Sequence, residues 1–174
     1  MSDIILVDEK DNQIGQMDKL EVHQKGLLHR AFSVFIFNDL NQLLLQKRAI
    51  DKYHSGGLWT NTCCSHPEAG ESVEDACARR LEEEMGFKAK LNFVTSFIYK
   101  AELDNQLTEH EFDHVFIGTY NAAPDPNSYE VSDWKYMDIA ELEKEIEIHP
   151  NNYTIWFRII FEEVKNHILG VKKK

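Results

Sequence analysis

The fold is decided by one stretch of the chain, Ser72-Val73-Glu74-Asp75-Ala76-Cys77-Ala78-Arg79-Arg80-Leu81-Glu82-Glu83-Glu84-Met85-Gly86. Its apolar residues recur at the spacing of one helix face, at positions 73, 76, 77 and 81. Ser72 can cap the start of a helix, and Gly86 can end it. The stretch therefore predicts a helix from about Ser72 to Met85.

Strands are predicted on both sides of this helix. Residues 31–37 are almost continuously apolar and β-prone, as expected of a strand buried on both faces. A turn at 38–41 leads into Leu43-Leu44-Leu45, which predicts a paired strand. Further strands are expected near 4–7, 93–99, 114–120 and 133–137, a loop at 122–127, and two closing helices near 139–146 and 153–168. Strands that flank single helices without regular βαβ alternation predict an α+β fold, a mixed β-sheet sandwiched between helices.

Length and composition bound the class of protein. The 174 residues fit a single domain spanning 1–174, and 43% of them are hydrophobic, enough for a core. The net charge of −11 argues against nucleic acid or an anionic membrane surface as a main partner. No apolar run approaches the roughly 18–20 residues of a transmembrane helix, so no membrane insertion is expected. The oligomeric state stays open, with a monomer as one option.

Two features predict a reduced cytoplasmic protein. The N-terminus, Met1-Ser2-Asp3-Ile4-Ile5, lacks the basic start and long apolar stretch of a signal peptide. The chain has three Cys, of which Cys63 and Cys64 are adjacent and pair poorly with each other. Cys63 is expected to be a buried small residue, and Cys77 falls on the apolar stripe of the predicted helix.

Three segments carry residues that can ligate a metal ion: His23 with His29, Cys63-Cys64-Ser65-His66, and Glu109-His110-Glu111. On a strand, Glu109 and Glu111 point to the same face. Two like charges held there need a cation between them, or one must hold a proton. Three imidazoles and two carboxylates would suit a divalent metal with mixed nitrogen and oxygen ligands. Taken one by one, surface His and solvated Glu side chains remain the alternative.

A second pattern points to a phosphate group. Glu84 ends the predicted helix, where the helix dipole disfavours negative charge, and shares a face with Arg80. A carboxylate there can hold Mg²⁺ against a phosphate. Arg48 and Lys52, beside a glycine-containing turn, can supply charge-assisted contacts to the same phosphate. A solvated helix end and two exposed cations are the plainer alternative.

These motifs resemble a known family. Residues 65–71 followed by 79–87 resemble a Nudix box, with Ser65 in place of its first Gly and Arg80 in place of the first Glu of its Arg-Glu pair. Leu-His-Arg-Ala-Phe-Ser at 28–33 and Trp-Thr-Asn-Thr-Cys-Cys-Ser-His-Pro at 59–67 are similar to the type I isopentenyl-diphosphate isomerases, a branch of the Nudix fold. The resemblance covers most of the chain, from about residue 19 to 156. It implies an enzyme that interconverts isopentenyl diphosphate and dimethylallyl diphosphate by protonation and deprotonation through a carbocation-like state.

The resemblance also implies roles for individual residues. Cys64 matches the family's essential Cys, and Glu111 matches the carboxylate that works on the opposite face of the alkene. The implied ligands of one divalent metal, Mn²⁺, Mg²⁺ or Zn²⁺, are His23, His29, His66, Glu109 and Glu111. The implied diphosphate-binding residues are Lys19, Arg48, Lys52 and Arg80, with Glu84 as ligand of a Mg²⁺ that bridges to the diphosphate. Tyr99 matches the Tyr beside the catalytic Glu, and Trp156 the aromatic that faces the cationic centre.

The chemistry is consistent with these residue types. An alkene is a weak base, and its protonation leaves a cation that water would trap, so the site must exclude water and offer both acid and base. A Cys, with a reference pKa of about 8.5, can act as thiol or thiolate. Two other functions remain open at this point. One is a Nudix hydrolase that splits a nucleoside diphosphate derivative with a metal-activated water, and the other is a non-enzymatic module with a structural zinc.

Overall fold

The computed structural model describes residues 3–173, and the side chains of residues 3–167. Its strands are β1 (Asp3–Val7), β2 (Gln13–Asp18), β3 (His29–Phe37), β4 (Gln42–Arg48), β5 (Trp59–Thr60), β6 (Cys63–Ser65), β7 (Asn92–Glu102), β8 (Thr108–Thr119) and β9 (Val131–Asp138). Its helices are α1 (Lys19–Lys25), α2 (Val73–Met85), α3 (Ile139–Ile148), the 3₁₀ turn η1 (Pro150–Asn152) and α4 (Ile155–Lys173). None of the described helices is long and apolar enough to cross a membrane.

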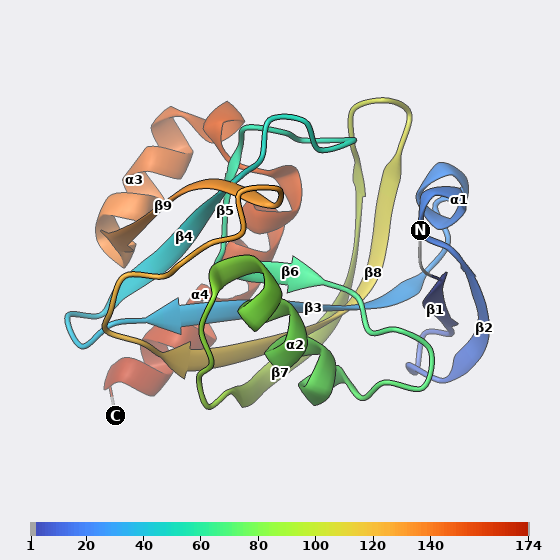
Figure 1. Cartoon of the computed structure of the whole chain (residues 1–174), viewed down its shortest axis with the longest axis horizontal. Helices are drawn as coiled ribbons and strands as arrows, with labels where there is room; N and C mark the ends of the chain where they lie inside the picture. The colour runs from blue at the N-terminus through green and yellow to red at the C-terminus, as the bar shows by residue number, and fades with distance from the viewer. Residues whose placement is uncertain (1–2, 174) are drawn as a thin grey trace.

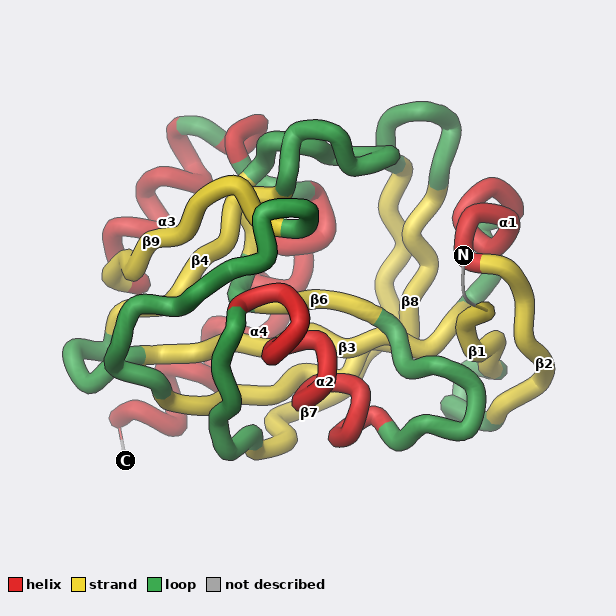
Figure 2. Tube along the Cα trace, in the orientation of Figure 1, coloured by secondary structure: helices red, strands yellow, loops and turns green. Residues whose placement is uncertain are grey.

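Strand β3 is the centre of the sheet. It pairs in parallel with β8 and antiparallel with β1, β4 and β6, while β7 and β8 form a long antiparallel hairpin. Its side chains alternate between two hydrophobic clusters: Val34 packs beneath α2, and Phe35 packs beneath α3 and α4. Figures 1 and 2 show α2 on the near side of the sheet and α3 and α4 on the far side. The α+β fold with a mixed sheet between helices is confirmed.

The helix that anchors the sequence analysis forms where it was expected. The Ser72 hydroxyl accepts a hydrogen bond from the Asp75 main-chain N–H at 3.1 Å, which caps the start of α2. At the other end, Gly86 adopts a left-handed φ of 76°, and a Cβ there would lie 2.1 Å from the Asp125 carbonyl oxygen. Only glycine satisfies both conditions. These two signals fix where α2 ends, and with it the position of Glu84.

Four elements differ from the sequence-based expectation. Helix α1 and strand β2 were not predicted. Helix α1 escaped prediction because it has only seven residues and shows no clear apolar stripe. Strand β8 begins at Thr108 rather than at 114, because its inward-facing residues are carboxylates and not apolar side chains. Strand β4 pairs with β3 only at Leu43, and its main partner is β9. Of the N-terminal residues examined for a signal peptide, Met1 and Ser2 lie outside the described residues.

Candidate active site

One small cavity of about 50 Å³ gathers most of the predicted site residues. It is lined by Lys19, His23, Arg48, Lys52, Tyr53, His54, Cys64, Ser65, His66, Arg80, Glu84, Glu109, Glu111, Glu130 and Trp156. A larger outer hollow of about 330 Å³ shares Lys19, Lys52 and Arg80 with it. Of the remaining predicted residues, His29 and Tyr99 stand directly behind the cavity wall and contact Glu111. The inner cavity has room for little water.

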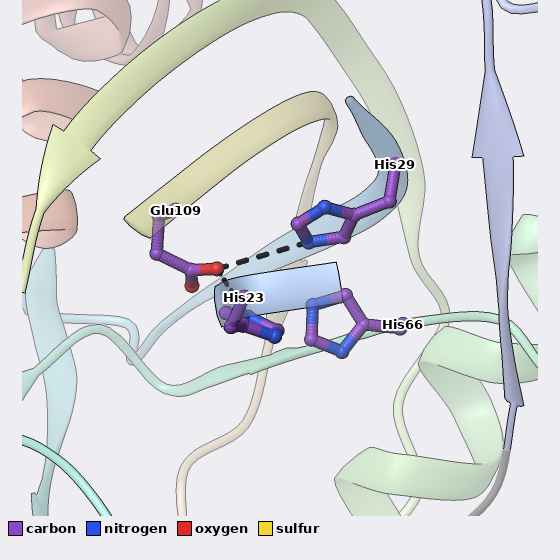
Figure 3. A group of neighbouring side chains, drawn as sticks. All are labelled: His23, His29, His66 and Glu109. Atoms are coloured by element: carbon purple, nitrogen blue, oxygen red, sulfur yellow. Dashed lines mark ion pairs between the residues drawn. The ribbon is translucent and has the colours of Figure 1, made fainter. Parts of the chain in front are cut away.

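A group of side chains able to ligate a metal ion stands at one end of this cavity. His23 from α1, His29 from β3, His66 after β6 and Glu109 from β8 offer ligand atoms that all lie within 4.8 Å of one another (Figure 3). The Nδ1 atoms of His23 and His29 donate to the Lys19 and Leu27 carbonyl oxygens at 2.6 and 2.9 Å. This fixes the tautomer, so each Nε2 carries its lone pair toward the centre of the group.

The donor set suits a cation. His23 Nε2 lies 2.5 Å and His29 Nε2 3.7 Å from Glu109 Oε1, yet none of these three buried atoms has a well-formed hydrogen bond among the described residues. Lone pairs that face one another in a buried space call for a positive charge between them. His66 Nε2 and His29 Nε2 also lie 3.1 and 3.4 Å from Glu111 Oε2. Glu111 thus faces the same centre, as the sequence predicted.

The two carboxylates differ in their pKa values. Burial and the charge of Glu111 raise the pKa of Glu109. For Glu111, burial acts in the same direction, but the neighbouring imidazoles of His29 and His66 outweigh it and hold the pKa well below the usual value. Burial lowers the pKa of His66 to about 3, so its imidazole is neutral and able to ligate. The pKa values of the two carboxyls are therefore moved apart, as expected for like charges held close together.

Cys64 faces the cavity from β6, surrounded by polar side chains. Its thiol donates to Asn61 Oδ1 at 2.9 Å, and its sulfur lies 3.6 Å from Ser33 Oγ. Burial, followed by the charge of Asp113, raises the pKa of the Cys64 thiol. On the same cavity, Glu111 Oε1 accepts a hydrogen bond from the Tyr99 hydroxyl. The predicted placement of Tyr99 beside Glu111 agrees with this contact.

Four cationic side chains gather at the other end: Lys19, Arg48, Lys52 and Arg80. Lys52 Nζ lies 2.6 Å from Glu130, and Arg80 pairs with Glu84 at 3.1 Å. Arg48 lies with its guanidinium carbon 5.0 Å from the centre of the Trp156 ring. Burial and the charge of Lys52 lower the pKa of Lys19, which reflects how closely these cations are packed. The arrangement is a cluster of four cations only partly neutralised by nearby carboxylates, which suits an anion.

Loop 49–58 contributes Lys52 to this cationic end of the cavity. Gly56 is required in it, because a Cβ there would lie 2.2 Å from the Ile50 carbonyl oxygen. The loop is tied to the tip of the β7–β8 hairpin, where Asp104 accepts from the Ser55 N–H at 3.2 Å and Asn105 donates to the Tyr53 carbonyl oxygen at 2.9 Å. Figure 1 shows the loop reaching across to the hairpin tip.

Comparison with known proteins now places the chain. A NUDIX domain model matches residues 27–157. A Photorhabdus laumondii protein named isopentenyl-diphosphate Delta-isomerase 2 is 54% identical over 157 residues, covering 90% of this chain and 89% of its own. The Pectobacterium atrosepticum isopentenyl-diphosphate Delta-isomerase is 46% identical and covers 100% of this chain and 97% of its own.

The chain belongs to the type I isopentenyl-diphosphate Delta-isomerase family, within the NUDIX superfamily. The fold agrees with this assignment: the crystal structure of a Deinococcus radiodurans protein, DR0079, superposes with a TM-score of 0.72 at 19% identity, over 85% of this chain and 90% of that one. The resemblance drawn from Leu28–Ser33 and Trp59–Pro67 is thereby confirmed at the level of the family.

The sequence did not single out several residues that line the cavity or form hydrogen bonds around Cys64. They are Ser33, Tyr53, His54, Asn61, Asp113 and Glu130. A signal existed for Asp113, because it continues the two-residue alternation of Glu109 and Glu111 on one strand face. Tyr53 and His54 directly follow Lys52 in loop 49–58, so they could have been grouped with it. No sequence pattern distinguished Glu130.

Proposed function

We propose that this chain interconverts isopentenyl diphosphate and dimethylallyl diphosphate, the reaction for which its relatives are named. The observation that carries the proposal is one cavity lined by both Cys64 and Glu111. Moving the double bond from C3–C4 to C2–C3 adds a proton at C4 and removes one at C2. Such a reaction needs an acid and a base at two sides of a bound alkene.

Cys64 and Glu111 are proposed to act from opposite faces of the alkene. The two oxygens of Glu111 have different neighbours: Oε2 faces His29 and His66, while Oε1 meets the Tyr99 hydroxyl. Oε2 therefore faces the proposed metal group, and Oε1, beside Tyr99, is left for proton transfer with the substrate. Because burial raises the pKa of Cys64, its sulfur is a thiol before the reaction, with a proton available for transfer.

The metal is proposed to be Mn²⁺, Mg²⁺ or Zn²⁺, held by His23, His29, His66, Glu109 and Glu111. Such a cation would neutralise the buried carboxylates and fix the orientation of Glu111. The mixed nitrogen and oxygen donors support a divalent ion of this class. We name this group, with Cys64, Tyr99 and Trp156, the alkene end of the pocket.

Trp156 is proposed to face the positive charge that develops on the substrate. Its ring is 3% exposed and lines the cavity. A desolvated cation–π contact contributes about 2 kcal/mol, a factor of about 30 in rate if it is made only in the transition state. This is a minor part of catalysis. Placement of acid and base around a bound alkene in a cavity with little water has to supply most of it.

The diphosphate end of the pocket is Lys19, Arg48, Lys52, Arg80 and Glu84. On a chain of net charge −11, a diphosphate binds only where cations are concentrated locally. The four cations are proposed to contact its oxygens, and Glu84 to hold a Mg²⁺ that bridges to them. Because these residues and Cys64 line one cavity, the pocket suits a substrate that joins a diphosphate to a five-carbon tail.

The deciding experiment incubates the protein with isopentenyl diphosphate in D₂O, with added Mg²⁺ and Mn²⁺. The proposal predicts dimethylallyl diphosphate that carries deuterium, with no release of phosphate. A parallel incubation uses nucleoside diphosphate derivatives, which a Nudix hydrolase would split. Phosphate release from either substrate without isomerisation would replace the proposal with the hydrolase.

A further inference from the structure

A row of polar side chains crosses three neighbouring strands and ends at the Cys64 sulfur. Ser33 of β3 is paired in register with Cys64 of β6, and on its other side β3 runs parallel to β8, which carries Asp113. Ser33 Oγ lies 3.6 Å from Cys64 Sγ and donates to Asp113 Oδ1 at 3.1 Å. Ser33 and Asp113 are 1% and 0% exposed, so water does not compete for these contacts.

Asn61 holds the sulfur from another direction. Its amide nitrogen donates to the carbonyl oxygens of Val34 and Cys63 at 3.0 and 3.1 Å. Because both amide hydrogens are used by the main chain, Asn61 Oδ1 must face Cys64, whose thiol donates to it at 2.9 Å. The Cys64 sulfur therefore lies between two buried oxygen atoms, Asn61 Oδ1 and Ser33 Oγ.

We propose that Ser33, backed by Asp113, is a positioning residue for Cys64 in the isomerisation, an inference that rests on the proposed function. A hydroxyl hydrogen rotates freely. While the sulfur carries its proton, the Ser33 hydroxyl donates to Asp113. When the proton has passed between sulfur and substrate, the same hydroxyl can turn to donate to the sulfur. Asp113 acts only through Ser33, as the acceptor that holds the hydroxyl in place.

The structure explains why one hydroxyl can serve both forms of Cys64. Ser33 lies on the central strand β3, which pairs with β6 on one side and with β8 on the other. This main-chain pairing fixes Ser33 relative to both neighbouring strands. The two contacts, at 3.1 and 3.6 Å, are reached by rotation about a single bond. Among the described side chains, Ser33 is the one hydroxyl within hydrogen-bond distance of the Cys64 sulfur. Loss of the Ser33 oxygen would leave the sulfur held by Asn61 alone.

The kinetic test compares Ser33→Ala with Ser33→Thr, which keeps the hydroxyl. We expect Ser33→Ala to lower kcat about tenfold, the loss of roughly one buried hydrogen bond, with KM for isopentenyl diphosphate unchanged. Ser33→Thr restores most of the rate. Asp113→Asn keeps an acceptor for Ser33 and retains kcat within about threefold. A kcat for Ser33→Ala equal to that of wild type overturns the proposal.

An independent readout does not need turnover. The infrared S–H stretch of Cys64, assigned by its disappearance in Cys64→Ala, reports the hydrogen bonds of the thiol. We expect this band to shift in Ser33→Ala and to stay in place in Cys77→Ala, whose sulfur lies in the core beneath α2. An unshifted band in Ser33→Ala shows that the contact is absent and also overturns the proposal. If wild type shows no isomerisation, the proposed function fails, while the band still tests the Ser33 contact.

Discussion

The alkene end and the diphosphate end of the pocket are built from different parts of the fold. At the alkene end, Cys64, Glu109 and Glu111 project from paired strands, and Glu111 is paired on both sides, with His29 of β3 and Tyr99 of β7. At the diphosphate end, Lys52 comes from loop 49–58 and Arg80 from a helix face. Strands hold atoms in place more tightly than loops do. Proton transfer needs such placement, whereas long cationic side chains can adjust to a charged group.

If this contrast holds, substitutions at the two ends should affect different kinetic constants. Substitutions at the alkene end should lower kcat, because they remove groups used during proton transfer. Substitutions at the diphosphate end should mainly raise KM, because the charge on the diphosphate is the same before and after the reaction. The predictions below test this separation, beginning with the largest effect.

Cys64→Ala is expected to have the largest effect. Removal of a proton-transfer group should lower kcat by about 10³-fold or more, while KM and the fold stay close to those of wild type. The measurement is steady-state isomerisation, with circular dichroism to check folding. Cys77→Ala is the matched control, because it removes another buried thiol, in the core, and should leave kcat unchanged. Near-normal turnover of Cys64→Ala would mean that this thiol is not part of the proton transfer.

Metal removal should be the next largest effect. A chelator should abolish turnover and lower the melting temperature, since a ligand present at 100 times its Kd stabilises a fold by about 2.7 kcal/mol. His29→Ala should melt at the same temperature with and without metal. His110→Ala should keep the metal response, because His110 lies between the two carboxylates but on the opposite face of β8, with Nδ1 3.1 Å from the Gly26 carbonyl oxygen. A metal response retained by His29→Ala would remove it from the ligand set.

Much of this architecture could be predicted from the sequence, for local reasons. Helix α2 carries its own start and stop signals in Ser72 and Gly86, and both work as expected. The buried run of β3 over residues 31–37 is apolar except for Ser33, so it can be recognised without reference to other parts of the chain. Glu109 and Glu111 were correctly expected to share a strand face, because that follows from a two-residue period alone.

The parts that escaped prediction depend on distant partners. Asp113 is a fully buried carboxyl, and its hydrogen-bond partner, Ser33, lies on a different strand, β3. The helix α1 is too short to be recognised by periodicity, and it is held by the Asp18 cap and by packing against β8. Glu130 joins the pocket through Lys52, a pairing between residues far apart in the sequence. Such tertiary contacts leave no local pattern.

Lys52→Met tests the diphosphate end. Loss of one charged contact to the diphosphate should raise KM by about tenfold to a hundredfold, with kcat nearly unchanged. Lys47→Met is the control, because Lys47 lies over the Trp59 ring at 5.9 Å and does not line the cavity. A variant that loses kcat rather than KM would show that the two ends do not divide binding and chemistry as proposed.

Glu84→Gln should have a smaller effect, confined to Mg²⁺. The amide keeps the size of the side chain but binds a cation poorly, so the Mg²⁺ concentration for half-maximal activity should rise by about tenfold. Saturating Mg²⁺ should restore most of kcat. Glu82→Gln, at an exposed position of the same helix, should leave the Mg²⁺ requirement unchanged. An identical requirement in Glu84→Gln and wild type would exclude Glu84 as a ligand.

The smallest expected effect concerns stability at the junction of the two ends, where His54 lies. Its ring packs edge-on against Trp156 at 5.5 Å, and its carbonyl oxygen accepts from Arg48 at 3.2 Å. Burial, followed by the charge of Arg48, lowers the pKa of His54 to about 2. In the unfolded chain this imidazole takes up its proton near pH 6.5. Between these two values the unfolded state binds more protons, so stability is fully present above pH 6.5 and falls as the pH falls.

His54→Asn should remove this contribution to acid sensitivity. Each pH unit below 6.5 costs the wild type about 1.4 kcal/mol through His54, so unfolding by urea at pH 7.5 and 5.5 should show a loss about 1.4 kcal/mol smaller in the variant. His149→Asn, at an exposed position after α3, should keep the wild-type difference. Equal losses in His54→Asn and wild type would mean that His54 reaches solvent in the folded protein. Loop 49–58 would then open readily, and the diphosphate end would be looser than its contacts with the hairpin indicate.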